Sequence, residues 1–180
     1  MKATGIVRRI DDLGRVVVPK EIRKTLRIRE GDPLEIFTDR EGKVILKKYS
    51  PIGELGSLAG IYADSLSKTL DCTVCITDTD QVIAAAGNGK KELQEMLLSA
   101  ELAEVFQERK TVLKKSSDAE FVAITKDRSE YSEEIISVIL SEGDIAGGVI
   151  FLQKNEKKHF GEMEKKFAAG AADLLGRQLS

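Results

Sequence analysis

The sequence lacks any apolar run long enough to cross a membrane. Its longest clearly apolar stretch, residues 145–152, contains two glycines and is far shorter than the roughly 18 residues that a spanning helix needs. No apolar segment follows the first four residues, so no secretory signal is visible. These absences exclude the membrane-spanning classes, and we expect a cytoplasmic protein with no membrane partner.

Cysteine and histidine are also scarce. Cys72 and Cys75 are the only cysteines, which is too few for a disulfide framework and fits a reducing compartment. Their C-x-x-C spacing would suit zinc, but a tetrahedral site needs two more ligands, and residues three apart in a strand face opposite sides. His159 is the sole histidine, so it has no second imidazole for a metal site. We therefore expect buried cysteines, a surface His159, and no metal or cofactor.

A phosphate-binding loop is missing as well. Gly87-Asn88-Gly89-Lys90 has the glycines of such a loop, but Ala84 stands where the first Gly is needed and Lys91 replaces Ser or Thr. Neither a nucleotide hydrolase nor a thiol redox enzyme is predicted. We expect a protein without catalytic residues.

Charge is divided unevenly along the chain. Residues 1–50 carry 13 Lys and Arg against eight Asp and Glu, a balance of +5, whereas residues 51–180 carry 15 against 22, a balance of −7. Phosphates attract the first part and repel the second. The asymmetry indicates a polyanionic partner for the first part, and it marks a domain boundary near residue 50.

The first 50 residues have the pattern of a small β-rich domain. Hydrophobic alternation and turn residues predict strands at 5–10 and 15–18 around a turn at 11–14, a two-turn helix from Pro19 that Gly31 stops, and a second hairpin of strands 33–38 and 43–48. Within the second hairpin, Leu34 with Ile36 and Val44 with Leu46 fall on one face. The apolar surface available to so short a segment is too small to offset the entropy of ordering it. We therefore predict an obligate homodimer through residues 1–50.

Beyond residue 50 the spacing of hydrophobic residues changes. Residues 51–54 are expected to be a short linker, because they follow Ser50 with a proline and a glycine. Beyond them, the pattern predicts helices at 55–70, 90–109 and from 160, with strands at 73–77, 81–86, 120–126, 135–140 and 145–153. Residues 55–180 thus form an α+β domain whose terminal helices we expect side by side.

Eight basic residues crowd into residues 5–29: Arg8, Arg9, Arg15, Lys20, Arg23, Lys24, Arg27 and Arg29. The simpler alternative is a solvated surface with ion pairs to Asp12 and Glu21. The excess of basic residues in this region and the richness in arginine favour DNA binding. A guanidinium group can form two parallel hydrogen bonds with a phosphate or with the edge of a guanine base. Arg8 and Arg9 point to opposite faces of a strand, so one flat sheet cannot present both in a single patch.

The stretch GIVRRIDDLGRVVVPKEIRKTLRIREGDPLEIF, residues 5–37, resembles the AbrB-type swapped-hairpin DNA-binding domain. The matching elements are G-I-V-R, L-G-R-V-V-P and E-I-R-K-T-L. The resemblance extends over residues 1–50 and implies a swapped-hairpin β-barrel dimer that binds double-stranded DNA. Carried over by position, the resemblance implies that DNA is contacted by Arg8, Arg9, Arg15, Arg23 and Lys24. A lysine such as Lys24 is suited to a phosphate contact rather than to a bidentate contact with a base.

Residues 55–180 resemble a GAF domain, an α/β sandwich that serves oligomerisation and sensing. The combination resembles AbrB-family transcription regulators, which implies a nucleoid-associated activator and repressor of sporulation genes. It also implies a homotetramer through the GAF-like domain and leaves a small-molecule effector open, although the motif of cyclic-nucleotide-binding GAF domains is absent. The alternative is an antitoxin that binds its operator and a toxin, because the swapped-hairpin fold also serves that class.

Overall fold

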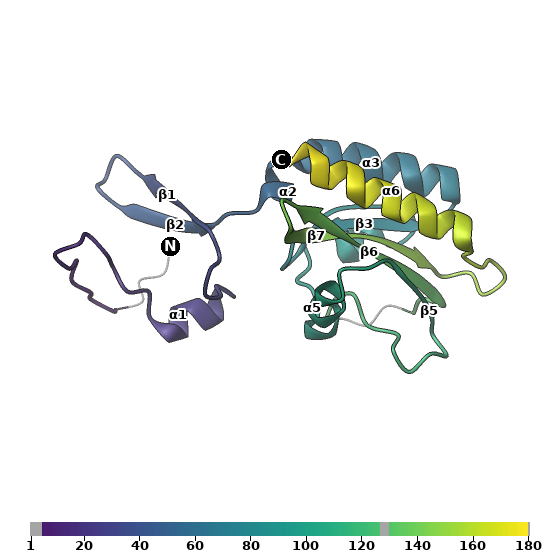
Figure 1. Cartoon of the computed structure of the whole chain (residues 1–180), viewed down its shortest axis with the longest axis horizontal. Helices are drawn as coiled ribbons and strands as arrows, with labels where there is room; N and C mark the ends of the chain where they lie inside the picture. The colour runs from purple at the N-terminus through teal and green to yellow at the C-terminus, as the bar shows by residue number, and fades with distance from the viewer. Residues whose placement is uncertain (1–4, 127–129, 180) are drawn as a thin grey trace. The chain divides into compact units, whose positions relative to one another are not determined.

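The computed structural model describes residues 5–126 and 130–179 and divides the chain into two compact units, Met1–Tyr49 and Ser50–Ser180. Figure 1 traces both units along the chain. Each has its own sheet, one of two strands and one of five. In the described residues, no helix combines the length and the apolar character that crossing a bilayer would require.

The N-terminal unit contains one helix and one regular hairpin. Its elements are α1 (Lys20–Thr25), β1 (Leu34–Thr38) and β2 (Val44–Lys48). The strands pair antiparallel, with Ile36 opposite Leu46 and Thr38 opposite Val44, so the predicted second hairpin and its apolar face are confirmed. Asp39–Gly42 forms the turn: Asp39 Oδ1 accepts the N–H groups of Glu41 (2.9 Å) and Lys43 (2.8 Å).

The predicted first hairpin is present only as its turn. At Asp11–Gly14, Asp11 N–H donates to the Arg15 carbonyl and Gly14 N–H to the Asp11 carbonyl, both at 3.1 Å, the same pattern as in the second turn. However, residues 5–10 and 15–18 form no strands in the single chain, so that prediction was wrong. A two-stranded ribbon with no covering layer is marginal in water, and these segments have no core of their own chain to pack against.

Helix α1 begins where predicted and ends earlier. Pro19 occupies the N-cap position, and the helix stops after Thr25 rather than at Gly31. Arg27 adopts a left-handed conformation (φ 54°), and Ile28 N–H donates to the Arg23 carbonyl at 2.8 Å. This bond belongs to the Schellman motif, which satisfies the last helical carbonyls and usually employs glycine. The residue in the left-handed position is Arg27 and not a glycine, so the sequence pattern did not indicate that the helix ends here.

The N-terminal unit has no hydrophobic core. Between residues 5 and 49 only Pro19 is buried. Val7 is 86% exposed, Val17 73% and Ile36 69%. The exposed large apolar side chains of this unit are Ile6, Val7, Ile10, Leu13, Val16, Val17, Leu26, Ile36, Phe37, Val44 and Leu46. So large an apolar surface on so small a unit marks a protein–protein interface.

The second unit is a five-stranded antiparallel sheet with helices on both faces (Figure 1). Its elements are α2 (Pro51–Glu54), α3 (Gly56–Leu70), β3 (Thr73–Thr77), β4 (Val82–Ala86), α4 (Lys90–Leu93), α5 (Ala100–Gln107), β5 (Val112–Lys115), β6 (Glu133–Ser141), β7 (Asp144–Gln153) and α6 (Glu162–Gln178). The strand order is β4-β3-β7-β6-β5. Helices α3 and α6 lie side by side on one face, and α5 lies on the other.

Two apolar clusters fill the two faces of this sheet. One packs Phe151 and Ile135 beneath α3 and α6, and the other packs Ile150 against Phe106 of α5. Cys72 belongs to the first cluster and Cys75 to the second. Burial raises the pKa of both thiols to about 12, so neither forms a thiolate at neutral pH. The prediction of buried cysteines on opposite sides is confirmed.

The expected linker is instead part of the second unit. Residues 51–54 form α2, where Ser50 Oγ accepts the Gly53 N–H at 3.1 Å as an N-cap. Ile52 is fully buried in the cluster beneath α3 and α6. The hydroxyl of Ser50 also donates to Asp78 at 2.9 Å, which fixes this helical turn to the sheet.

Two further expectations for this unit were wrong, and one strand was not predicted. The helix expected at 90–109 is split into α4 and α5, because residues 94–98 run along the edge of β4: Val82 N–H donates to the Met96 carbonyl, and Glu95 N–H to that of Val82. No strand forms at 120–126, where only Thr125 bridges to Leu98. Strand β5 pairs with β6. It was not predicted, because two of its four residues are lysines.

Candidate nucleic-acid interface

The five predicted contact residues lie on three consecutive segments of the N-terminal unit. Arg8 and Arg9 precede the Asp11–Gly14 turn, Arg15 follows it, and Arg23 and Lys24 lie on α1. All are exposed except Arg23, which is half-buried. Phosphate contacts require such accessible cationic side chains.

Asp11 organises the turn between the arginines. Its Oδ1 accepts the N–H groups of Leu13 (3.0 Å) and Arg15 (2.8 Å), and its Oδ2 accepts Arg15 Nε at 2.8 Å. The backbone N–H of Arg15, and then its guanidinium, hold the pKa of the Asp11 carboxyl below its usual range. Because the pair is exposed, it adds little stability, and its effect is to orient Arg15.

The role of Asp11 was not predicted from the sequence, although a signal for it exists. An Asp at the first position of a turn and a Gly at the fourth are the residues that a type I turn favours. Gly14 has φ +76°, a conformation that side chains with a Cβ rarely adopt. Asp39 and Gly42 repeat this arrangement.

Arg23 connects α1 to the segment before it. Its Nε donates to the Val18 carbonyl at 3.2 Å, which uses one of the five N–H donors of the guanidinium. The five residues thus come from three segments of the N-terminal unit, of which only α1 has regular secondary structure.

The second unit holds a different electrostatic feature, a pair of adjacent buried carboxyl groups. Glu133 accepts the Phe160 N–H and His159 Nδ1, both at 2.7 Å. Although burial raises the pKa of Glu133, these two partners hold it below its usual range. His159 is exposed, as predicted, and is additionally paired with this carboxylate. Among the described residues, no cluster of His, Cys, Asp and Glu is suited to a metal ion.

Glu134 gives the second unit a pH-dependent stability. Its Oε1 accepts the Val122 N–H at 3.1 Å, and no hydrogen bond to Oε2 occurs in the described part of the chain. Burial raises the pKa of Glu134 to about 7, against the opposing effects of Val122 N–H and Lys114. The folded state therefore binds a proton more tightly than the unfolded state between about pH 4.5 and pH 7.

Stability should consequently fall as pH rises through this window. We expect Glu134→Gln, which stays neutral and still accepts from Val122, to raise the free energy of unfolding at pH 8 by about 1–3 kcal/mol and to change it little at pH 4.5. Urea unfolding of both proteins at the two pH values measures this difference. Equal pH dependence of the variant and the parent would show that Glu134 is ionised in the folded protein.

Two family models match the chain, one for each unit. Residues 54–180 match the model described as stage V sporulation protein T C-terminal, transcription factor. Residues 7–54 match the model described as antidote-toxin recognition MazE, bacterial antitoxin. The first match extends over more than half of the chain.

Curated relatives extend the likeness to the whole length. Stage V sporulation protein T of Bacillus subtilis is 50% identical over 183 aligned residues, which span 99% of each chain. The transition state regulatory protein AbrB of the same organism is 65% identical over 51 residues, 28% of this chain and 52% of AbrB.

Among solved structures, the GAF domain from the Acinetobacter phosphoenolpyruvate-protein phosphotransferase superimposes with a TM-score of 0.56 at 15% identity. The match extends over 69% of this chain and 81% of that one and shows the fold alone. The predicted α+β architecture, an AbrB-type domain followed by a GAF-like sandwich, is thus confirmed. The chain belongs to the stage V sporulation protein T family of transcription factors, DNA-binding regulators with an AbrB-type N-terminal domain.

Proposed function

We propose that two copies of the N-terminal unit interleave into one DNA-binding head. The observation that carries this proposal is the missing core: Pro19 is the only buried residue between residues 5 and 49. A second copy supplies both the apolar surface and the neighbouring strands that residues 5–10 and 15–18 lack. The obligate homodimer through the first 50 residues is therefore the functional form of this unit.

Interleaving also explains how the basic residues act. Two copies place ten cationic side chains on one head, since each contributes Arg8, Arg9, Arg15, Arg23 and Lys24. Arg15, held by Asp11, and Arg23, held by the Val18 carbonyl, are the most fixed of the set. The head contacts double-stranded DNA mainly at phosphates, while DNA shape and deformability supply much of the sequence preference.

Alanine substitutions test this assignment directly. Arg8→Ala, Arg9→Ala, Arg15→Ala and Arg23→Ala, each in the full chain, should weaken DNA binding about tenfold or more, because every dimer loses two contacts. Arg40→Ala is the matched control: Arg40 is an exposed arginine at the tip of the second hairpin and outside the proposed set. DNA titration by fluorescence anisotropy at fixed salt gives the comparison. If Arg40→Ala weakens binding as much as the other four, charge alone and not this surface determines affinity.

The second unit joins such heads into a homotetramer. Helices α3 and α6 lie side by side and expose apolar side chains to solvent, with Ile61 67% exposed and Met163 61% exposed. Phe167 and Leu174 continue this surface along α6. A tetramer carrying two heads could hold two DNA sites at once and gain avidity without new contacts to DNA.

A charged residue on this surface should prevent tetramer formation and leave the N-terminal dimer intact. Phe167→Asp is expected to convert the tetramer to a dimer, because the interface would have to bury an unpaired carboxylate. Sedimentation velocity of the full chain measures the change, with Phe167→Leu as the control that keeps an apolar side chain. A Phe167→Asp protein that remains tetrameric would place the second interface elsewhere.

The regulatory context follows from the family. The chain acts in the cytoplasm on the nucleoid as an activator and repressor of sporulation genes, and the GAF-like unit is the place for a small-molecule effector. The protein has no enzymatic role in this proposal. Loss of regulated transcription from a sporulation promoter in Arg15→Ala cells would agree with it.

One observation favours a second candidate function. The match of residues 7–54 to the MazE antitoxin model allows an antitoxin that binds its operator and a toxin. The long, well-packed second unit argues against this alternative, because such antitoxins bind their toxins through short, poorly ordered tails. Co-purification of a small basic protein with the full chain at fixed stoichiometry would support the alternative.

A further inference from the structure

Asp11 is an acidic residue within a basic stretch. It lies between Arg9 and Arg15, which both belong to the proposed DNA contacts, and a second acidic residue, Asp12, follows it. A carboxylate near phosphates weakens DNA binding, because like charges repel. Both oxygens of the Asp11 carboxylate are hydrogen-bonded within the N-terminal unit. The side chain of Asp12, in contrast, has no hydrogen bond or ion pair in the described part of the chain.

Two hydrogen bonds to Asp11 hold the Arg15 side chain against its own backbone. The backbone N–H of Arg15 donates to Asp11 Oδ1 and its Nε donates to Oδ2, each at 2.8 Å. Leu13 N–H, which donates to Oδ1 at 3.0 Å, fixes the carboxylate itself. An exposed ion pair alone contributes little stability, but here the turn already immobilises the acceptor. The guanidinium is therefore oriented before DNA arrives, and less side-chain entropy is lost on binding.

The place of this bond on the guanidinium determines which donors of Arg15 remain. A guanidinium has five N–H donors, of which Nε carries one. With Nε bound to Asp11, the four N–H groups of Nη1 and Nη2 are left, and no hydrogen bond within the described residues uses them. These two nitrogens can donate parallel bonds to a phosphate or to O6 and N7 of guanine. The other bidentate edge of the guanidinium, which includes Nε, is blocked.

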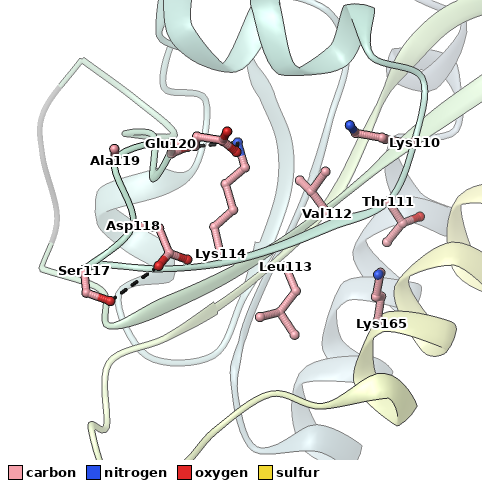
Figure 2. A pocket seen from close by; sticks show the side chains of 10 residues that line it. All are labelled: Lys110, Thr111, Val112, Leu113, Lys114, Ser117, Asp118, Ala119, Glu120 and Lys165. Carbon is pink, nitrogen blue, oxygen red and sulfur yellow. Dashed lines mark hydrogen bonds and ion pairs between the residues drawn. The ribbon is translucent and has the colours of Figure 1, made fainter.

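Lysines of the second unit show a different outcome of pairing with a carboxylate. In the groove along β5, Lys114 Nζ donates to the Glu120 carbonyl at 2.9 Å and lies 3.7 Å from the Glu120 carboxylate (Figure 2). Lys110 pairs with Glu108 at 2.8 Å. An ammonium group is a compact charge without a planar fork, so its carboxylate partner neutralises it. The guanidinium of Arg15, bound only at Nε, instead keeps a complete pair of donors on an exposed side chain.

We propose that Asp11 is a specificity-determining residue for DNA binding, which acts by holding Arg15 in one orientation. This role of Asp11 rests on the DNA contact proposed for Arg15. A fixed pair of donors makes both of its bonds only where two acceptors lie at the matching place, so DNA sequences that offer them there are favoured. The negative charge of Asp11 also repels the phosphates of every duplex. Asp11 thus lowers affinity in general and increases discrimination between sequences.

Asp11→Asn separates this role from the structure of the turn. Oδ1 accepts two backbone N–H groups and Oδ2 accepts only Nε, so the amide oxygen of asparagine should take the Oδ1 position and keep the turn. The amide NH2 then faces Arg15 Nε, donor against donor, and the guanidinium is released. Asp12→Asn is the matched control, because it removes the same charge from the same turn and has no bond to Arg15.

Two DNA titrations of the full chain by fluorescence anisotropy, at the same fixed salt, test the proposal. One probe is a duplex enriched from a random-sequence pool by the parent protein, and the other carries the same bases in scrambled order. For Asp11→Asn, the ratio of the two affinities should fall about tenfold, because the enriched duplex binds more weakly and the scrambled one does not. Asp12→Asn should change both affinities alike and leave the ratio within about twofold of the parent.

Arg15→Ala distinguishes failure of this proposal from failure of the function on which it rests. In the Arg15→Ala protein, adding Asp11→Asn should not lower the ratio further, because Asp11 acts through Arg15. If Arg15→Ala weakens binding but Asp11→Asn leaves the ratio unchanged, Arg15 contacts DNA without Asp11 and only this proposal fails. If Arg15→Ala binds both duplexes as the parent does, the contact role of Arg15 fails as well. Equal weakening of both duplexes by Asp11→Asn would also overturn the proposal, because Asp11 would then support the head without discriminating between sequences.

Discussion

Ile36→Asp is expected to abolish DNA binding by the full chain and to prevent association of its N-terminal units. Ile36 is 69% exposed in the single chain and lies directly opposite Leu46 on the apolar face of the β1–β2 hairpin. In the proposed interleaved head this face becomes core, where an unpaired carboxylate costs several kcal/mol per copy. A dimer contains two copies, so the penalty applies twice.

The measurement combines DNA titration with sedimentation of the same samples. Ile36→Val is the control, because it keeps a β-branched apolar side chain and should cost only about 1 kcal/mol per copy. The single-chain hairpin would tolerate Asp at so exposed a position. DNA affinity of Ile36→Asp within about threefold of the parent would therefore mean that a single N-terminal unit binds DNA unaided.

DNA affinity of the full chain should fall about 10³–10⁵-fold between 50 and 200 mM salt. This estimate applies to 6–10 phosphate contacts, and two copies of the five basic residues offer ten candidate side chains. Each contact releases condensed counterions from DNA, which makes the logarithm of affinity linear in the logarithm of salt concentration.

The slope of that line also reports single residues. Arg15→Ala removes two contacts from each dimer, so the slope should decrease by about 1.8, at about 0.9 per contact. The control Arg40→Ala should leave the slope unchanged. A flat salt dependence of the parent would contradict a phosphate-contacting surface altogether.

The N-terminal unit shows where sequence reasoning succeeds and where a single chain limits it. Asp39 and Gly42 specify their turn locally, and the hairpin around it was predictable. Asp11 and Gly14 specify an identical turn, yet the strands around it do not form. The difference is physical: turn geometry is encoded by neighbouring residues, whereas strands 5–10 and 15–18 need an apolar layer that their own chain does not supply.

In the second unit, the errors arise from tertiary pairing that overrides local pattern. The apolar runs of β3, β6 and β7 and the stripes of α3 and α6 were strong enough to predict. Gln94 was not, because its side chain bonds the Ala85 N–H and the Ile83 carbonyl of β4 as a substitute peptide, a contact that sequence spacing does not encode. Glu134 was missed for a similar reason, since a charged residue within a strand gives no sign that it is fully buried.

Composition and resemblance together predicted the candidate site. Charge asymmetry and arginine richness indicated a part that binds a polyanion, and the family resemblance implied the five residues. Their distribution over three consecutive segments follows from the predicted turn at 11–14 and the predicted helix from Pro19. The contribution of Asp11, whose Oδ2 accepts Arg15 Nε, was not predicted, because it depends on a side-chain contact within the turn.

The most direct test of the shared core is the unfolding of residues 1–53 at increasing protein concentration. If two copies form one core, the apparent free energy of unfolding should increase by about 1.4 kcal/mol for each tenfold rise in concentration, and the folded species should sediment as a dimer. A folded monomer whose unfolding midpoint does not change with concentration would contradict the account.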